Sequence, residues 1–312
     1  MKKKKINNGF NIVSFYRFIN IVDKKELKKE LDRHLKDKLI KGTILLSDEG
    51  INGTISGEKY DVQEVLIKIK KFLNIRKIKQ NSSSINFLPF NRMKVRLKKE
   101  CVSLGKNISL NQSGTLVSPE KWDSVINEKD FIIIDTRNKF EIEIGTFDKS
   151  LNPMTNSFRE FPDKFNKLKI DKKTKIAMFC TGGIRCEKAS SYLKGKGYKN
   201  VFQLDGGIIN YLKLKKKSKS KSQWNGDCFV FDNRVTVNKN LVPGKYIQCF
   251  GCRRPIQKKI RLSPFYKQGV SCPSCYDQRT NNQKQKSIVR QYQIDTAEKN
   301  KKNHPFKKIY FE

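Results

Sequence analysis

The N-terminal third of the chain spaces its apolar residues as a small domain of alternating strands and helices does. "FNIVSFYRFI" predicts a strand, and residues 24–39 predict a helix because four leucines recur on one face. "GTILLSDEGINGTISG" predicts two strands around a sharp polar turn, and residues 60–73 predict a second helix. "SINFLPF" and "MKVRLKKECV" supply the last strand signals. This β-α-β-β-α-β order is typical of a ferredoxin-like sandwich, which we assign to residues 1–105.

A different pattern follows a polar linker at residues 106–118. Ser118 and Pro119 have the residue types of a helix N-cap and first helical position. The segments "FIIIDT", "KIAMFC" and "VFQLDGG" are apolar without alternation, as expected of strands that are buried on both faces. The helical segment "RCEKASSYLKGKG" separates the last two. Residues 119–213 are therefore predicted to form an α/β domain with a parallel sheet.

The remaining sequence is basic and rich in cysteine. "LKLKKKSKSKSQW" predicts a second linker, and residues 214–280 predict a small cysteine-rich module. Residues 281–312 contain many Lys, Gln and Asn residues with little periodicity, which predicts a disordered basic tail. The fold class is thus a combination of α/β and α+β domains with a zinc-ribbon-like module at the end.

Composition limits the classes of protein only in part. The 312 residues are 37% hydrophobic, and their formal net charge is +37. This charge favours RNA or DNA as a partner. However, Lys greatly outnumbers Arg, and Asn and Ile are also abundant, so AT-rich coding would give the same excess. No apolar run is long enough to cross a bilayer, and no apolar segment follows the basic N-terminus. We expect a cytoplasmic protein without a membrane partner.

Four of the eight cysteines have the spacing of metal ligands. "CFGC" and "CPSC" give two C-x2-C pairs that are 19 residues apart, a pattern typical of a structural zinc site. The predicted ligands are Cys249, Cys252, Cys272 and Cys275. The alternative is a small domain of reduced cysteines that has lost its metal. Two of the other cysteines, Cys101 and Cys228, are expected to be small buried residues.

The stretch "FCTGGIRCEKAS" has the composition of a reactive-thiol loop. Cys180 ends a buried strand, Gly182 and Gly183 allow the backbone amides to turn inward as an anion nest, and Arg185 begins a helical segment. The amides, the helix N-terminus and the arginine all favour the thiolate. We therefore predict that Cys180 is the nucleophile, that Arg185 supports it, and that Thr181, Gly182, Gly183 and Ile184 form the nest around the sulfur.

Cys186 follows at the start of the same helical segment. It has the position of a resolving thiol that could form a disulfide with an oxidised Cys180, but we favour a small residue packed beneath the loop. A mononuclear iron facial triad needs two histidines and a carboxylate. The chain has only His34, in a charged helical segment, and His304, in the tail, so such a site is not expected. No flavin or haem motif is visible either.

The loop resembles the active-site loop of rhodanese-type sulfurtransferases. "IIDTRNKFEIEIG" is similar to the upstream motif of that family, with Asp135, Arg137, Glu141 and Gly145 in matching places, and "LDGGIINYL" is similar to its closing segment. The resemblance implies a persulfide on Cys180. Related phosphatases have a loop that is one residue longer, so phosphatase activity is not expected.

A wider resemblance spans residues 10–280. "EGINGTISG", "MKVRLKKE", "NPMTNSFREFP", "CTGGIRCEKA" and "NGDCFVFDNRV" together resemble the bacterial tRNA uridine hydroxylase family. This resemblance implies tRNA as the partner, molecular oxygen as co-substrate, and 5-hydroxyuridine at the wobble position as the product. DNA is not expected as a partner.

Two other functions stay open. A sulfurtransferase would pass persulfide sulfur to tRNA or to an acceptor protein, with a sulfur-donor protein as a further partner. A non-catalytic RNA-binding protein would use its zinc module, in which Arg253, Arg254, Phe265 and Tyr266 could contact RNA. The intact Cys180 and Arg185 argue against the second alternative.

Overall fold

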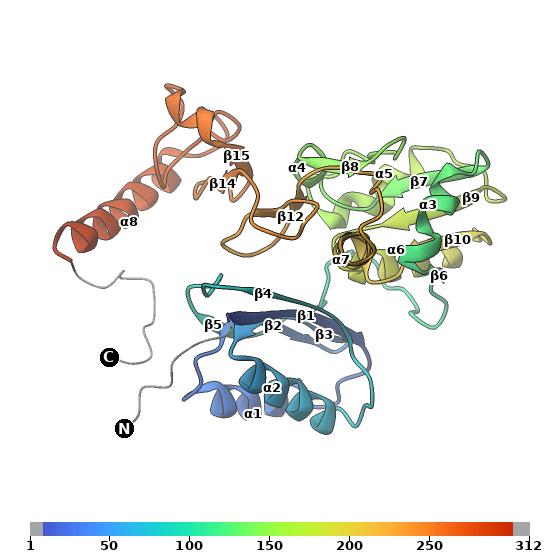
Figure 1. Ribbon diagram of the computed structural model, residues 1–312, viewed down its shortest axis with the longest axis horizontal. Coiled ribbons are helices and arrows are strands. Elements are labelled where there is room, and N and C mark those ends of the chain that lie inside the picture. The colour runs from blue at the N-terminus through green and yellow to red at the C-terminus, as the bar shows by residue number, and fades with distance from the viewer. Residues whose placement is uncertain (1–8, 302–312) are drawn as a thin grey trace.

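The protein has three structural units in the computed structural model, which describes residues 9–301 (Figure 1). We call residues 10–101 the N-terminal domain, residues 115–241 the central domain, and residues 246–301 the C-terminal module. Figure 1 shows the N-terminal domain below the central domain, with the C-terminal module to one side of both.

The N-terminal domain has the predicted β-α-β-β-α-β order, followed by one more strand. Its elements are β1 (Phe10–Phe18), α1 (Lys24–Leu35), β2 (Lys41–Ser47), β3 (Gly50–Gly57), α2 (Lys59–Phe72), β4 (Lys79–Ile85) and β5 (Met93–Leu97). The strands form one sheet in the order β4-β1-β3-β2-β5, in which β2 and β5 are parallel and the other neighbours are antiparallel. Both helices cover one face of this sheet, and the other face is turned toward the central domain (Figure 1).

The core of this domain lies between the sheet and its two helices. Leu27, Leu31 and Leu35 are buried on α1, as the leucine stripe predicts. Leu39 is not part of the helix, because α1 ends at Leu35 and the chain turns there toward β2. The stripe therefore gives the buried face correctly and the end of the helix four residues too late.

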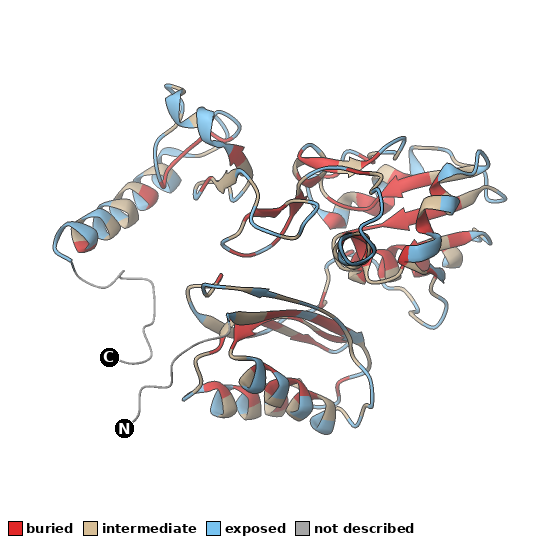
Figure 2. Ribbon diagram, in the orientation of Figure 1, coloured by how far each residue is buried: buried red, intermediate tan, exposed pale blue. Residues whose placement is uncertain are grey.

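The central domain contains a parallel sheet surrounded by helices. Its elements are β6 (Thr115–Val117), α3 (Pro119–Asn127), β7 (Phe131–Asp135), α4 (Lys139–Ile142), β8 (Gly145–Phe147), a 3₁₀ turn (Phe158–Glu160), α5 (Phe161–Asn166), β9 (Lys175–Phe179), α6 (Ile184–Gly195), β10 (Val201–Leu204) and α7 (Gly207–Ser218). The strand order is β6-β10-β9-β7, with every neighbouring pair parallel. Four successive residues of β9 are buried, which agrees with its lack of alternation (Figure 2).

The first predicted linker contains a strand. Helix α3 begins at Pro119 after Ser118, as predicted. Strand β6 lies just before it, within residues 106–118, and pairs with β10 at the edge of the sheet. A strand of three residues is too short to show a period in the sequence, so the linker prediction missed it.

The structure continues past the predicted boundary between residues 213 and 214. Helix α7 continues to Ser218, and the chain then returns to the central domain through β11 (Trp224–Gly226), β12 (Cys228–Phe229) and β13 (Thr236–Val237). Strand β11 pairs with β8. Trp224, Cys228, Val230 and Val237 belong to the core of the central domain. Lysines on the exposed side of α7 hid the helix, and strands of two or three residues gave no pattern.

The C-terminal module contains a short hairpin, a 3₁₀ turn and one long helix. These are β14 (Tyr246–Gln248), β15 (Pro255–Gln257), the turn Lys258–Leu262 and α8 (Asn281–Lys299). Helix α8 corrects the prediction of a disordered tail from residue 281. The side chain of Thr280 accepts a hydrogen bond from the amide of Gln283, and the Gln283 side chain accepts one from the amide of Thr280, so a capping box starts the helix.

The polar surface of α8 explains why its periodicity was not visible. Only Ser287 and Ala297 are buried on it, and most of its surface is exposed in Figure 2. Two arginines connect α8 to the rest of the module. Arg290 on the helix donates to the Gly269 carbonyl oxygen. Arg279, just before the helix, donates to the Val270 carbonyl oxygen and to the Ser287 hydroxyl on α8. The rest of the predicted tail, including His304, lies outside the described residues.

The N-terminal domain is attached to the central domain by a buried lysine. The Nζ of Lys188 on α6 lies 2.7 Å from a carboxylate oxygen of Glu49 and 2.6 Å from one of Glu100, and its side chain is 1% exposed. Glu49 is in the sharp turn between β2 and β3. Nearby, Glu187 accepts hydrogen bonds from Tyr16 and Lys79 of the N-terminal domain, at 3.0 and 2.5 Å. The polar turn noted in the sequence is thus part of the domain interface.

Cys101 and Cys228 are both buried, as predicted, with exposures of 1% and 0%. Within residues 9–301, none of the helices combines the length and the apolar character that crossing a membrane requires.

Lys188→Met is expected to lower the free energy of unfolding by about 3 kcal/mol, because it leaves two carboxylates at the interface without their cation. The matched control is Lys79→Met, whose side chain is 35% exposed in the same interface and which should cost less than about 1 kcal/mol. Urea denaturation followed by far-ultraviolet circular dichroism measures both. Equal losses would show that burial of Lys188 adds nothing to the attachment.

Candidate active site

Cys180 lies directly after β9, at the carboxyl end of a central strand of the parallel sheet. The loop that follows leads into α6 at Gly183, which has a left-handed backbone with φ +98°. Gly207 is also left-handed, and a Cβ there would lie 2.4 Å from the Cys180 carbonyl oxygen. Both positions therefore require glycine: one to turn the loop and one to let the start of α7 approach it.

Helix α7 fixes the direction of the loop backbone. The amide of Ile208 donates to the Cys180 carbonyl oxygen at 2.9 Å, and the amide of Ile209 donates to that of Thr181 at 3.2 Å. With these carbonyl groups held by α7, the loop presents an amide to the thiol, since the Gly183 amide donates to Cys180 Sγ at 3.1 Å. This contact is one of those that the predicted anion nest would make.

The surroundings of Cys180 favour its thiolate. Burial alone would raise its pKa, since Cys180 is 1% exposed. A hydrogen bond from the Cys186 thiol, the positive charge of Arg185, and the amides of Cys186 and Gly183 outweigh burial and lower the pKa to about 5. A pKa this low favours the thiolate at neutral pH, which is the nucleophilic form of cysteine.

Cys186 is the neutral partner of this thiolate. Burial and the adjacent Cys180 sulfur raise the pKa of Cys186 well above its ordinary value. Its side chain is completely buried, and its sulfur lies 3.5 Å from the hydroxyl of Thr136. This placement fits the interpretation of Cys186 as a packed residue beneath the loop, and it adds a role as a hydrogen-bond donor to Cys180.

Arg185 is held by a buried carboxylate that links the loop to the upstream motif. Its guanidinium donates to both carboxylate oxygens of Glu141, at 2.7 and 2.9 Å, and to the hydroxyl of Thr181 at 3.2 Å. Burial would raise the pKa of Glu141, but the charge and hydrogen bonds of Arg185, together with Arg137 and the Asn138 amide, outweigh burial and lower it. Arg185 therefore contributes positive charge near the thiol and also links the loop to Glu141 by hydrogen bonds. The sequence did not indicate this second role.

The rest of the upstream motif forms a second buried ion pair. Arg137 donates to Asp135 through Nε at 2.9 Å and through Nη2 at 2.6 Å, and both side chains are 0% exposed. The same Nη2 donates to the Gly145 carbonyl oxygen, and the guanidinium lies 5.0 Å from the ring centroid of Trp224. This pair joins β7, β8 and β11, so it holds the frame in which the loop sits.

The remaining predicted loop residues have different surroundings. Thr181 and Gly182 line a cavity, Gly183 donates to the thiolate, and Ile184 is the first residue of α6. Of the four, Gly183 is the residue with a hydrogen bond to the Cys180 sulfur among the described residues.

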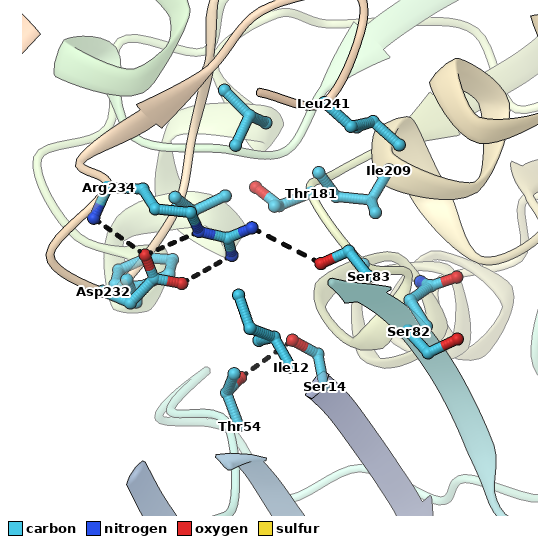
Figure 3. Close-up of a pocket in the computed structure, with 15 residues that line it drawn as sticks. Ile12, Ser14, Thr54, Ser82, Ser83, Thr181, Ile209, Asp232, Arg234 and Leu241 are labelled. Carbon is cyan, nitrogen blue, oxygen red and sulfur yellow. Dashed lines mark hydrogen bonds and ion pairs between the residues drawn. The ribbon is translucent and has the colours of Figure 1, made fainter. Parts of the chain in front are cut away.

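The cavity beside the loop has three walls from distant parts of the sequence. Its volume is about 80 Å³. The sheet of the N-terminal domain contributes Ile12, Ser14 and Thr54, which Figure 3 shows on the side opposite Thr181. Residues 230–241 form the third wall, including Phe231 and the ion pair of Asp232 and Arg234.

Sequence analysis identified the loop wall, with Thr181 and Gly182, but neither of the other two walls as part of the site. The signal that could have found one of them is the spacing of "DNR" in "NGDCFVFDNRV", which repeats that of "DTR" in the upstream motif.

The four predicted zinc ligands come together in the C-terminal module. The sulfurs of Cys249, Cys252, Cys272 and Cys275 all lie within 4.8 Å of one another. The distances are 4.0 Å for Cys249–Cys275 and 3.8 Å for both Cys252–Cys272 and Cys272–Cys275. Four sulfurs at about 2.3 Å from a tetrahedral zinc ion are about 3.8 Å apart. The donor set and its spacing therefore fit zinc.

Two protein-family models match successive parts of the chain. Residues 10–101 match the UPF0176 acylphosphatase like domain, and residues 118–214 match the rhodanese-like domain.

Solved structures similar to about a third of the chain include two rhodanese-type proteins. A rhodanese-related protein from Thermoplasma volcanium is 22% identical, with 32% of this chain and 92% of that chain covered and a TM-score of 0.27. A rhodanese-like domain protein from Staphylococcus aureus is 20% identical, with 31% and 90% covered and a TM-score of 0.27.

One similarity extends over nearly the whole chain. A protein of Pelagibacter ubique (strain HTCC1062) named tRNA uridine(34) hydroxylase is 48% identical over 304 residues, which cover 96% of this chain and 99% of that protein. This extent includes all three structural units, the Cys180 loop and the four-cysteine cluster. The chain belongs to the tRNA uridine(34) hydroxylase family.

Proposed function

We propose that this protein hydroxylates the wobble uridine of tRNA to 5-hydroxyuridine, with molecular oxygen as co-substrate and Cys180 as the reacting group. The observation that carries the proposal is a thiol whose pKa is lowered to about 5 in an amide nest beside a cavity. The full-length similarity to a protein named for this reaction supports the substrate.

The chemistry needs a nucleophile because the C5–H bond of uracil is not acidic in the free ring. Addition of the Cys180 thiolate at C6 would place enolate charge on C5, where an oxygen species can be received. Loss of the C5 proton and departure of the thiolate then restore the ring. One oxygen atom enters the C5–H bond, and the other leaves as water with two protons and two electrons from a reductant.

The charge distribution supports tRNA as the substrate. Lys94 of β5 has its pKa lowered by burial and by three nearby cations, Arg92, Arg96 and Arg253. The last of these belongs to the C-terminal module, so two units contribute to one positive surface. Phosphate groups are the natural partners of such a cluster.

We also propose that the four cysteines of the C-terminal module hold a structural zinc ion. Four protein ligands would close the tetrahedral shell and leave no open position for catalysis. The ion would supply folding energy to a module whose buried core consists largely of the cysteines themselves.

Sulfur transfer is the second candidate function, because the amide nest that stabilises a thiolate can also hold a persulfide. The product distinguishes the two functions. Sulfur transfer to tRNA gives a thiolated nucleoside, whereas hydroxylation gives 5-hydroxyuridine.

Cys180→Ser is expected to abolish 5-hydroxyuridine formation, because a hydroxyl stays protonated where the thiol ionises. Mass spectrometry of tRNA nucleosides from a strain lacking the gene and carrying the variant measures this. Cys186→Ser should reduce activity less, since a hydroxyl can still donate to the Cys180 sulfur. Full complementation by the Cys180→Ser protein would exclude the thiol as the reacting group.

The thiolate should also be visible directly. The ultraviolet difference spectrum between wild type and Cys180→Ser is expected to titrate with a midpoint near pH 5, compared with about 8.5 for a free cysteine. The reactive form is therefore present above this midpoint and is lost as the pH falls through it. A midpoint near the free value would contradict the assignment.

Purified protein is expected to contain about one zinc ion per chain, and Cys249→Ser or Cys272→Ser should lose the ion and destabilise the C-terminal module. Elemental analysis and limited proteolysis measure the two effects. Cys101→Ser is the matched control, because this buried cysteine lies in the N-terminal domain and its loss should leave the metal content unchanged. Freshly reduced protein without zinc would refute the proposal.

Binding to tRNA is expected to weaken steeply with salt, because bound cations displace counterions from phosphate groups. Replacing Arg253 and Arg254 with glutamine should lower the slope of log affinity against log salt by roughly one to two. The control replaces Lys25 and Lys29 on the exposed face of α1. Equal effects of the two double variants would show that the charge is not localised.

A further inference from the structure

The ion pair of Asp232 and Arg234 has the same geometry as the buried ion pair of Asp135 and Arg137. Arg234 donates to Asp232 through Nε at 2.9 Å and through Nη2 at 2.6 Å. Arg137 makes the same two contacts with Asp135, at the same two distances. In both pairs one residue separates the acid from the arginine, and the arginine amide also donates to the carboxylate. Each aspartate therefore fixes the orientation of its guanidinium.

Arg137 and Arg234 differ in the surroundings of their guanidinium groups. Arg137 is completely buried and is used within the frame of the central domain. Arg234 lines the cavity beside the Cys180 loop, and its side chain is 9% exposed. Figure 3 shows its guanidinium reaching from the wall of residues 230–241 toward Ser83 on the N-terminal sheet.

One nitrogen of Arg234 has donor capacity left. Within residues 9–301, Nη1 donates to the Ser83 hydroxyl at 3.5 Å, which is the long limit for a hydrogen bond. A guanidinium has five N–H donors. A nine-tenths buried donor that is this weakly satisfied, and that faces a cavity, is suited to an acceptor on a ligand.

The charge balance favours a neutral ligand over an anion. The Asp232 side chain is 2% exposed and lies against the guanidinium, so it cancels most of the positive charge. A phosphate in the cavity would be repelled by this carboxylate, whereas a neutral carbonyl oxygen can accept from Nη1. The opposite wall carries the hydroxyls of Ser14 and Thr54, which are 2.9 Å apart.

The size and walls of the cavity suit a single ring. Its volume is about 80 Å³, several times the roughly 10–15 Å³ that one water needs. Phe231 lines it and is 66% exposed, which leaves an aromatic face for stacking. The Arg185 guanidinium lies 6.0 Å from the centroid of this ring, so Phe231 is also next to the catalytic loop.

We propose that this cavity is the recognition pocket for the pyrimidine base, with Phe231 stacking on the ring and Nη1 of Arg234 donating to a ring carbonyl. Asp232 is the positioning residue that holds the guanidinium. The proposal rests on the proposed function, because it takes the wobble uridine as the base. In this proposal the "NGDCFVFDNRV" segment recognises the base, and the N-terminal sheet forms the opposite wall of the pocket.

The test measures binding without turnover. The full chain carrying Cys180→Ser is titrated with an anticodon stem-loop RNA that has uridine at the wobble position, and with the same RNA that has an abasic site there. Uridine is expected to bind at least about tenfold more tightly, because stacking and a charge-assisted hydrogen bond are both gained. Adding Phe231→Ala or Arg234→Gln should each lower this preference about fivefold or more, while binding of the abasic RNA stays the same.

Tyr60→Ala is the matched control, since Tyr60 is a similarly exposed aromatic residue, at 70%, on α2 and outside the cavity. Phe231→Ala keeps the test independent of folding, because Phe231 is largely exposed, whereas Arg234→Gln leaves Asp232 without its cation.

Equal binding of the two RNAs, or a full preference retained by Phe231→Ala, would overturn the pocket assignment. Either result could occur while nucleoside analysis still shows 5-hydroxyuridine formation, so failure of the pocket and failure of the proposed function are distinguishable.

Discussion

The central domain is organised around one demanding requirement, a negative charge on a sulfur that is 1% exposed. An anion at this depth loses its hydration, so the protein must replace water with fixed donors and charges. The Gly183 amide, the Cys186 thiol and Arg185 supply them. Each donor needs support of its own: Gly207 lets α7 hold the loop carbonyls, and Glu141 compensates the buried guanidinium. Much of the upstream motif therefore serves the charge on Cys180 indirectly.

The N-terminal domain depends on the same helix that stabilises the thiolate. Helix α6 begins at the loop and carries Glu187 and Lys188, which bind the N-terminal sheet and the turn between β2 and β3. These residues are only one or two helical turns from Cys180. Their contacts therefore fix the position of the N-terminal sheet relative to the cavity. A rigid connection of this kind is needed if one wall of a small cavity comes from another domain.

The features that could be predicted from the sequence are those with a local cause. The apolar runs of β7 and β9 predict a parallel sheet, the glycines predict an anion nest, and the two C-x2-C pairs predict a four-sulfur cluster. The bidentate contact between Arg185 and Glu141 could not be predicted in this way, because it joins residues 44 positions apart. The cavity combines three distant segments, and residues 224–241 return to the central domain through strands too short to have a period. Helix α8 was missed because its stability comes from a capping box and arginine contacts, with few apolar residues.

Burial of the site also has a chemical consequence for the proposed reaction. Once a thiolate has added to C6, the charge on C5 can take up either a proton or oxygen. Water would supply the proton at once and return the unchanged base. The sulfur is almost completely enclosed, and the cavity beside it has apolar side chains such as Ile12 and Ile209 between its polar groups. A base stacked on Phe231 would displace the remaining water from this small volume. The enclosure of the site thus has two effects. It makes the thiolate costly to stabilise, and it keeps the adduct of the thiolate and the base from being protonated by water.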